Sequence, residues 1–420
     1  MGFAEKYLAK QSFRTILISR APENSELLKY IVIIPAYSEP EIQNTLQSIL
    51  NTHPVMDCIE VYMLINYPEH CSDEIKAQNN AHFESLSDWS IKNSTTKIHF
   101  NPLLAKNLPG KHAGAGLARK LLMDWACKRF EEVNMPDGII FSLDADTIVP
   151  KNYFTSIEEC KQSDKKASCY LFNFAHPTTG NEFTPAVYDA ITQYELHLRY
   201  YRYMLRQIGF PYFQYTVGSC FAIEALTYVK AGGMNKRKAG EDFYFLQKVF
   251  PNNKTVFLSE TILIPSARPS WRVPFGTGPT VRKITGNINK NYKTYNPKSF
   301  FDLETFLQLI PQLYKINTEK ELNTLLQDLP DSVLSYLNAI DLNNRLKEIK
   351  QNSASEQSFE KRFYQWFDAF NVIKYLNKVR ERHPDIEVNT AVTIGLNTNK
   401  NVSSEKLLEI LREMDRKTIL

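Results

Sequence analysis

Short apolar runs alternate with amphipathic stretches over the first 150 residues of the chain. The β-branched run Tyr30–Ile34 is stopped by Pro35, and residues 40–51 then carry apolar side chains at helical spacing. The same order returns at residues 59–65 and 73–86, at residues 97–100 and 112–130, and in a fourth apolar run, Ile139–Leu143. Strands that alternate with helices in this way predict a parallel sheet joined by right-handed crossovers.

The fourth apolar run ends in two acids separated by one residue, Asp144 and Asp146. Their carboxylates are expected at the carboxyl end of a buried strand, which is the edge where open α/β sheets bind ligands. A carboxylate pair there suits a hard divalent cation whose other ligands are phosphate oxygens and water. Asp is also a common turn residue. The pair therefore predicts either a metal-assisted diphosphate site or a loop that the two acids cap.

The helix expected at residues 112–130 follows Lys111 and carries Gly114, Gly116 and Arg119. Small residues in its first turn, with positive charge before and on it, would bring backbone N–H groups and a cation near a phosphate. The alternative is close packing of a glycine-bearing helix on the sheet. The six-residue dinucleotide fingerprint is not completed here, so the glycines alone do not decide between the two.

Further strands are predicted at residues 167–174, 218–223 and 255–258, and helices at residues 186–208 and 243–250. The helix at 186–208 is rich in Tyr and Arg, which suits either a sugar or anionic acceptor or, more simply, packing. Glu241 and Asp242 lie at the start of the helix near residue 243, where acids act as caps and dipole partners. Capping explains one acid, and the second is then available as a general base.

The loop after the strand at 255–258 contains Arg268, Trp271 and Arg272, with glycines following. Two arginines four residues apart on a shaped loop can hold an anion, although a solvated loop is the simpler alternative. From residue 300 the pattern is helical. It includes a capping box at Thr318 and Glu321 and a long helix over residues 359–383.

Composition narrows the class of protein. The chain has 420 residues, 43% of them hydrophobic and 23% charged, with a net charge of +4, which fits a soluble protein of two or three domains. This small charge does not indicate a nucleic-acid partner. No apolar run approaches the roughly 20 residues of a membrane span, and the first 19 residues do not resemble a secretory signal. Six scattered cysteines without C-x-x-C spacing indicate free thiols, so a cytoplasmic location without a zinc site is expected.

Four motifs, in this order and spacing, resemble those of the family 2 glycosyltransferases. They are Val32–Glu39 at the first strand, Leu143–Asp146 as the DxD motif, Gly218–Ile223, and Gly232-Gly233 followed by Glu241-Asp242 as the "ED" element. The resemblance covers about residues 30–285. It implies an α/β fold of the GT-A type, a mostly parallel sheet flanked by helices. We therefore expect a lead-in at residues 1–29, this domain at 30–290, and a mainly helical accessory region at 300–420.

The resemblance also implies roles for individual residues. A nucleotide-diphosphate sugar donor would contact Pro35, Ala36, Tyr37, Glu39, Lys111, Arg119 and Asp144. Asp146, with Asp144, would bind Mn²⁺ or Mg²⁺, and Asp242 would deprotonate an acceptor hydroxyl for attack with inversion. Candidates to contact the acceptor or a phosphate are Glu241, Arg268, Trp271 and Arg272.

The expected activity is the transfer of a single sugar, of the hexosyl type, in bacterial-type glycan or glycoconjugate synthesis. Single addition is favoured because the Q-x-x-R-W element of processive synthases is missing and no membrane span is present. Asn66 stands where many members have an acid that reads the base, so base choice stays open. Alternatives are a sugar-phosphate nucleotidyltransferase and a non-catalytic nucleotide-sugar-binding protein. The acceptor is unknown, and the helical region could bind acceptor, partner or membrane surface.

Overall fold

The chain forms two compact units. The sheet unit comprises residues 1–183, 216–282 and 415–420, and the helical unit comprises residues 184–215 and 283–414. The computed structural model describes residues 2–11, 17–19, 27–37, 39, 41–110, 114–236, 240–271, 276–286, 291–399 and 401–418.

Nine strands of the described residues form one sheet in the order β1-β4-β3-β2-β5-β8-β7-β9-β6. Their bounds are β1 (Leu17–Ser19), β2 (Leu28–Ala36), β3 (Cys58–Pro68), β4 (Ile98–Leu108), β5 (Ile139–Ser142), β6 (Thr147–Ile148), β7 (Ala167–Phe174), β8 (Phe221–Glu224) and β9 (Lys254–Pro265). Strands β4, β3, β2 and β5 are parallel neighbours, and β7 is parallel to β9. The prediction of a mostly parallel α/β sheet is confirmed. Strand β8 runs antiparallel between β5 and β7, which the periodicity did not indicate.

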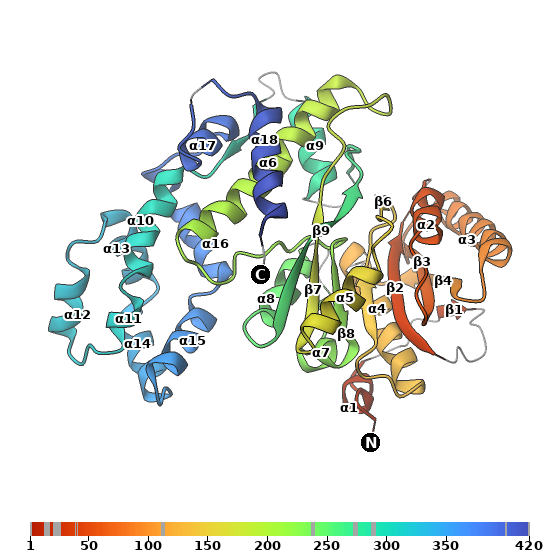
Figure 1. The fold of residues 1–420 in the computed structure, drawn as a ribbon, viewed down its shortest axis with the longest axis horizontal. Helices are drawn as coiled ribbons and strands as arrows, with labels where there is room; N and C mark the ends of the chain where they lie inside the picture. Colours follow the sequence, from red (N-terminus) through yellow and green to blue (C-terminus); the bar gives the residue numbers. More distant parts are fainter. Residues whose placement is uncertain are drawn as a thin grey trace. The chain divides into compact units, whose positions relative to one another are not determined.

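Helices cover both faces of this sheet. The helices of the sheet unit are α1 (Glu5–Leu8), α2 (Ile42–Leu50), α3 (Asp73–Asn93), α4 (Ala115–Glu132), α5 (Thr155–Ser163), α7 (Ala225–Lys230) and α8 (Glu241–Val249). Helix α9 (Thr277–Gly286) begins in this unit and continues into the helical unit. Helix α3 packs on β3 and β4, and α4 packs on β2, β3 and β5 (Figure 1). Because both faces are covered, Ile31 to Ile34 are all fully buried, which explains the unbroken apolar run in β2.

Several strands are longer than predicted. Strand β2 continues through Pro35, which we expected to end it. Pro35 and Ala36 pair only with β3, because the ladder with β5 ends at Ile33. The missing N–H of proline is therefore tolerated near the end of the strand, beyond the last pair with β5.

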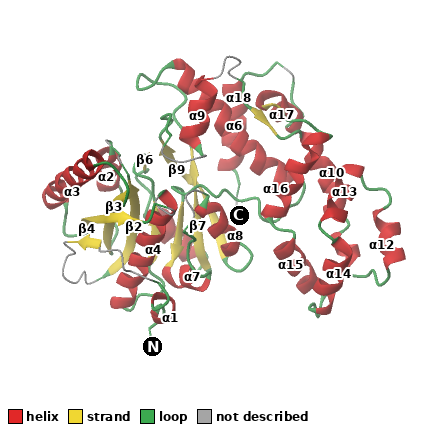
Figure 2. Cartoon of the chain, turned by 180° about the vertical axis from the view of Figure 1, so that it is seen from behind, coloured by secondary structure: helices red, strands yellow, loops and turns green. Residues whose placement is uncertain are grey.

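The helical unit contains only short strands among its described residues, β10 (Lys293–Thr294) and β11 (Ile386–Glu387) (Figure 2). Its helices are α6 (Pro185–Gln207), α10 (Pro297–Leu307), α11 (Ile310–Leu313), α12 (Glu319–Leu326), α13 (Asp331–Ala339), α14 (Leu342–Gln351), α15 (Glu356–Trp366), α16 (Ala369–Lys378), α17 (Val388–Gly395) and α18 (Ser404–Arg416), with a 3₁₀ turn at Val379–Glu381. A mainly helical region after residue 300 is thus confirmed. None of the helices in the described ranges has the length and apolarity needed to cross a membrane.

The aromatic helix α6 belongs to the core of the helical unit. Tyr200 is buried and meets the ring of Phe300 edge to face, with centroids 5.8 Å apart. Arg199, also buried, donates from Nε to Glu195 at 2.7 Å. The packing interpretation of the Tyr and Arg stripe therefore accounts for these side chains.

The long helix predicted at residues 359–383 is wrong, because α15 and α16 are separate. The break falls at Phe367 and Asp368, and the Asp368 carboxylate accepts a hydrogen bond from the N–H of Asn371 at 3.0 Å, capping α16. The capping box at Thr318 and Glu321 is confirmed.

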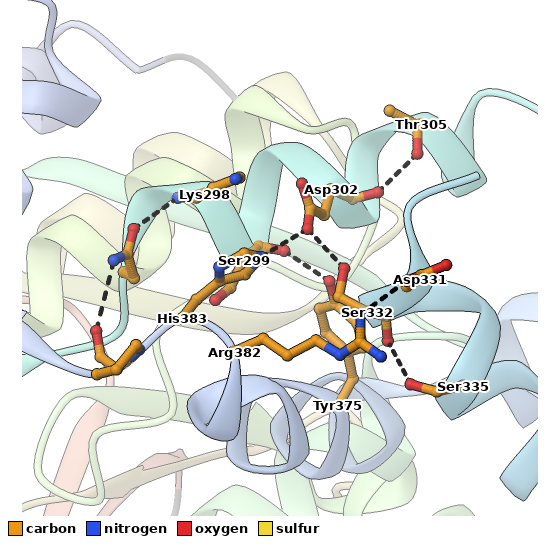
Figure 3. A network of polar contacts seen from close by, with 12 residues as sticks. Lys298, Ser299, Asp302, Thr305, Asp331, Ser332, Ser335, Tyr375, Arg382 and His383 are labelled. Carbon is orange, nitrogen blue, oxygen red and sulfur yellow. Dashed lines mark hydrogen bonds and ion pairs between the residues drawn. The ribbon is translucent and has the colours of Figure 1, made fainter. Parts of the chain in front are cut away.

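A polar network joins α10, α13 and the chain after α16 (Figure 3). The Asp302 carboxylate contacts Nε2 of His383 at 2.7 Å and accepts from Oγ of Ser332 at 2.5 Å. Tyr375 donates its hydroxyl to the carbonyl of Ser299 at 3.0 Å. Ser332 and His383 both bind the carboxylate of Asp302, which links three segments of the helical unit.

Candidate active site at the carboxyl edge of the sheet

The acid pair leaves the sheet beside the end of β2. Strands β2 and β5 are parallel, and their ladder ends at Ile33 and Ser142. The N–H of Thr147 donates to the carbonyl of Asp144 at 3.2 Å, so the two acids lie in a turn. Helix α2 holds that turn, since Oγ of Thr45 donates to the carbonyl of Ala145 at 3.0 Å. The two predictions made for Asp144 and Asp146, a turn and a position at the ligand-binding edge of the sheet, are therefore compatible with one another.

Both carboxylates of the pair are accessible from solvent. The exposed fraction of the side chain is 42% for Asp144 and 31% for Asp146. Each is also close to an arginine, and the two arginines define two clusters. The Arg119 cluster consists of Arg119, Ser142, Asp144, Gly218 and Glu241, and the Arg268 cluster consists of Arg268, Glu39 and Asp146.

Arg119 of helix α4 is buried, with 4% of its surface exposed, and its guanidinium donates to four groups. Nε donates to Glu241 at 3.0 Å, and Nη2 donates to Asp144 at 2.8 Å. Nη1 donates to Oγ of Ser142 at 2.7 Å and to the carbonyl of Gly218 at 3.1 Å. Ser142 in turn donates to the same carbonyl at 2.7 Å. The guanidinium thus joins the acid pair to the start of α8.

Burial alone would lower the pKa of Arg119, but the charges of Asp144, Glu241 and Asp242 outweigh it and raise the pKa. Arg119 is therefore a permanent cation. Its contacts are protein acids, a hydroxyl and a carbonyl, so its predicted contact with a donor phosphate stays a prediction.

Asp242 follows Glu241 in the first turn of α8, after Gly240 in the left-handed conformation (φ 70°). Its Oδ1 accepts from the N–H of Phe243 at 2.7 Å. A Cβ placed on Gly218 would stand 2.8 Å from Nη2 of Arg119 and 3.0 Å from Oδ2 of Asp242, so both groups crowd the same glycine. Glycine at this position leaves room for the carboxylate to lie beside the cation.

Burial and the charge of Glu241 raise the pKa of Asp242 to about 7, against the opposing effect of Arg119. A half-buried carboxyl that titrates near neutral pH can accept a proton from a hydroxyl and release it again. Glu241 is buried and bound to Arg119. The two adjacent acids therefore have different environments, and the role of Asp242 as a general base stays a prediction.

The Arg268 cluster lies on the other carboxylate of the pair. Nη2 of Arg268 is 2.6 Å from Oε2 of Glu39 and 3.5 Å from Oδ2 of Asp146. The hydrogen bond to Glu39 raises the pKa of Arg268 further. Glu39 is buried, whereas the Arg268 side chain is 25% exposed. The structure thus brings Glu39, Asp146 and Arg268, from distant parts of the chain, to one place.

The remaining predicted residues lie as follows. Pro35 and Ala36 end β2, Ala36 is buried, and Tyr37 follows half-buried. Trp271 is 79% exposed, with the guanidinium carbon of Arg282 5.9 Å from its ring centroid. Lys111 and Arg272 lie outside the described residues.

Two partners of Arg119 were missed as functional candidates by the sequence analysis. Ser142 is a fully buried hydroxyl inside an apolar strand, and Gly218 contributes a carbonyl. The signal for Ser142 was its position two residues before Asp144, where a buried polar side chain needs a partner. The carbonyl of Gly218 carries no signal in the sequence.

The residues present fit a divalent cation bound together with a diphosphate. Asp144 and Asp146 offer hard oxygen ligands, and Mg²⁺ sites with one or two carboxylates plus substrate phosphates are common. No group of three or more His, Cys, Asp or Glu side chains that could hold a metal occurs within the described ranges. The protein groups described would therefore supply a minority of the ligands.

The chain matches no protein-family model and no curated protein. Among solved structures, it is similar to residues 1–349 of S. aureus TarS in complex with UDP-GlcNAc, with 14% identity, a TM-score of 0.39, and coverage of 92% of this chain and 90% of that one. The complex with UDP gives 14% identity, a TM-score of 0.37 and the same coverage. Likeness at this level carries no assignment, and what the site can do follows from its own geometry.

Proposed function

We propose that this chain is a metal-dependent, inverting glycosyltransferase of family 2 with a GT-A domain. It would move a single sugar, of the hexosyl type, from a nucleotide-diphosphate sugar to an acceptor hydroxyl, in bacterial-type glycan or glycoconjugate synthesis. One observation carries the proposal. Asp242, with its pKa raised to about 7, lies beside the same buried guanidinium that binds Asp144 of the acid pair. A proton acceptor and a cation-binding pair at one sheet edge are the two parts that sugar transfer to a hydroxyl requires.

The donor would lie over the carboxyl ends of β2 and β5. Residues after β2 (Pro35, Ala36, Tyr37 and Glu39) would contact the base and ribose, and Asp144 and Asp146 would hold Mn²⁺ or Mg²⁺ against the diphosphate. When bound, such a cation offsets the negative charge that develops on the leaving diphosphate. Lys111, Arg268 and Arg272 remain candidates to contact phosphate groups.

Asp242 would take the proton of the acceptor hydroxyl as its oxygen forms a bond to the anomeric carbon. The bond from that carbon to the diphosphate oxygen breaks on the opposite side, so the anomeric configuration inverts. Arg119 binds both Glu241 and Asp144 and would hold them beside this reaction centre. Its charge also limits how far burial raises the pKa of Asp242.

The first test is a melting-temperature series of the full chain with UDP, GDP, CMP and dTDP, each with and without Mn²⁺. A ligand at a hundredfold excess over its dissociation constant stabilises the folded state by about 2.7 kcal/mol. We expect one nucleotide to raise the melting temperature only with the metal, and the shift to vanish in Asp146→Asn. Product analysis then separates the reactions, since transfer releases nucleoside diphosphate whereas a nucleotidyltransferase releases pyrophosphate. If no nucleotide raises the melting temperature in a metal-dependent way, the proposed donor site is wrong.

A further inference from the structure

The acid proposed as the principal metal ligand already has a cation beside it. Nη2 of Arg268 lies 3.5 Å from Oδ2 of Asp146, while its stronger contact is to Glu39 at 2.6 Å. Since Glu39 is buried, it anchors the guanidinium on one side. The Arg268 side chain is 25% exposed, so a ligand can reach its other side from solvent.

The pairing of strands β6 and β9 brings Arg268 and Asp146 close together. Thr147, next to Asp146, pairs with Pro265 in the ladder between β6 and β9, and Arg268 follows Pro265 by three residues. The buried Ala267 and a hydrogen bond from the N–H of Arg268 to Oγ of Ser266, at 3.2 Å, hold the intervening chain. Strand pairing therefore brings the backbone near Arg268 close to Asp146, and the hydrogen bond to Glu39 holds the guanidinium there.

A guanidinium at this position acts in opposite directions on two ligands. Two cations close to the same carboxylate repel one another, so Arg268 weakens the binding of a lone divalent cation at Asp146. A diphosphate bound to that cation brings negative charge, and Arg268 can donate to its oxygens. The same side chain then strengthens binding.

We propose that Arg268 is a resident counter-ion of Asp146, which disfavours a divalent cation alone and favours the cation together with a diphosphate. The inference rests on the proposed metal and donor site and adds a rule for it. The site discriminates against free metal ions and takes the cation and the diphosphate as a unit.

The test is a pair of Mn²⁺ titrations of the full chain. Mn²⁺ alone is monitored by electron paramagnetic resonance of the free ion, and Mn²⁺ with excess inorganic pyrophosphate is monitored by equilibrium dialysis of the pyrophosphate against the protein. Without phosphate, Arg268→Gln is expected to bind Mn²⁺ about tenfold more tightly than wild type, because a nearby positive charge is removed. With inorganic pyrophosphate added, the same variant is expected to bind the Mn²⁺–pyrophosphate complex about tenfold more weakly, because a charge-assisted contact is lost. The opposite signs are the diagnostic result, since a damaged site would weaken both.

Three variants serve as controls. Arg345→Gln removes an exposed arginine that pairs with Glu348 in the helical unit, and should leave both titrations unchanged. Arg268→Lys keeps the charge, so Mn²⁺ alone should bind as weakly as to wild type. Asp146→Asn should remove site binding in both titrations.

The outcomes separate the two proposals. If Mn²⁺ binding depends on Asp146 but Arg268→Gln leaves it unchanged or weakens it without pyrophosphate, the counter-ion role is overturned and the metal site stands. If neither wild type nor Arg268→Gln binds Mn²⁺ with pyrophosphate, the metal site of the proposed function fails and the counter-ion role fails with it.

Discussion

The two arginine clusters use the same chemistry in different surroundings. In each, one guanidinium lies between two acids: Arg119 between Asp144 and Glu241, and Arg268 between Glu39 and Asp146. Arg119 is 5% exposed as a side chain and donates to a hydroxyl and a carbonyl as well, whereas Arg268 is 25% exposed. The difference indicates that the first arginine fixes the site and the second is available to an incoming ligand.

The loss of an arginine is expected to cost different amounts of folding free energy in the two clusters, because water reaches the two guanidinium groups to different extents. A buried charge pair that loses one member leaves the other without compensation, whereas water replaces a lost partner near the surface. Asp144 is thus bound by the buried arginine, whereas Asp146 lies beside the more exposed one. This division places Asp144 on the side of Asp242, the proposed base, and Asp146 on the side of the proposed ligand.

The largest expected effect is on stability and tests this comparison directly. Arg119→Met should lower the free energy of unfolding by about 3–5 kcal/mol, because Glu241 remains buried without its cation. Arg268→Met should cost less, about 1–3 kcal/mol, because the more exposed Arg268 makes fewer contacts, although Glu39 also remains buried without its cation. Guanidinium chloride unfolding followed by circular dichroism measures both. Equal losses in the two variants would contradict the division into a fixed and an exchangeable arginine.

The next effect concerns the reactive acid. Asp242→Asn should lower kcat for transfer by about 10²–10⁴-fold, since no carboxylate remains to accept the hydroxyl proton. Nucleotide binding should persist, because Asp242 is not a proposed donor contact. In the wild type, transfer should fall as the pH drops below about 7, where Asp242 becomes protonated. Retained transfer in Asp242→Asn, measured with any accepted donor, would remove Asp242 from the mechanism.

A smaller effect should follow from crowding the glycine between Arg119 and Asp242. Gly218→Ala places a Cβ 2.8 Å from Nη2 of Arg119, so the buried guanidinium or the acid must shift. Overpacking of this kind costs about 1–3 kcal/mol. Gly110→Ala is a matched control, because an added Cβ there meets nothing within 4 Å. A melting temperature equal to that of the control would mean that the cluster is looser than its contacts indicate.

Much of the sheet was predictable because its strands are buried on both faces. The apolar runs at β2, β5 and β7 are recognisable in the sequence. Asp144 and Asp146 follow the end of β5, and Glu241 and Asp242 begin helix α8. The antiparallel insertion of β8 was not predictable from periodicity, since an apolar strand reads the same in either direction.

The hydrogen-bond partners of Arg119 could not be predicted from the sequence either. The position of Arg119 on a helix that follows small residues predicts a nearby phosphate, but this prediction uses only the local sequence. Its contacts are set by tertiary structure, through residues 99 and 122 positions away in the chain, Gly218 and Glu241. The sequence around a basic residue on a helix does not indicate whether its side chain will contact a ligand or an acidic side chain of the same protein.

The smallest expected effect tests what the neighbourhood of Arg119 does to Asp242. Since burial raises the pKa of this carboxyl to about 7, the stability it contributes is fully present below its unfolded pKa, about 4, and is lost as the pH rises through about 7. Asp242→Asn should therefore melt about 1–3 °C above wild type at pH 8, and this difference should shrink toward pH 4. Differential scanning calorimetry at both pH values measures it.

Asp146→Asn is the matched control for the calorimetric measurement, because Asp146 lies beside the more exposed arginine, Arg268. If it gave the same gain at pH 8, general repulsion among the acids at this edge would account for both variants. A gain confined to Asp242→Asn would instead mean that Arg119 does not fully offset the burial of the carboxylate beside it. The protein would then give up stability at neutral pH to keep a proton acceptor at the fixed side of the site, as reactive groups held in unfavourable surroundings do.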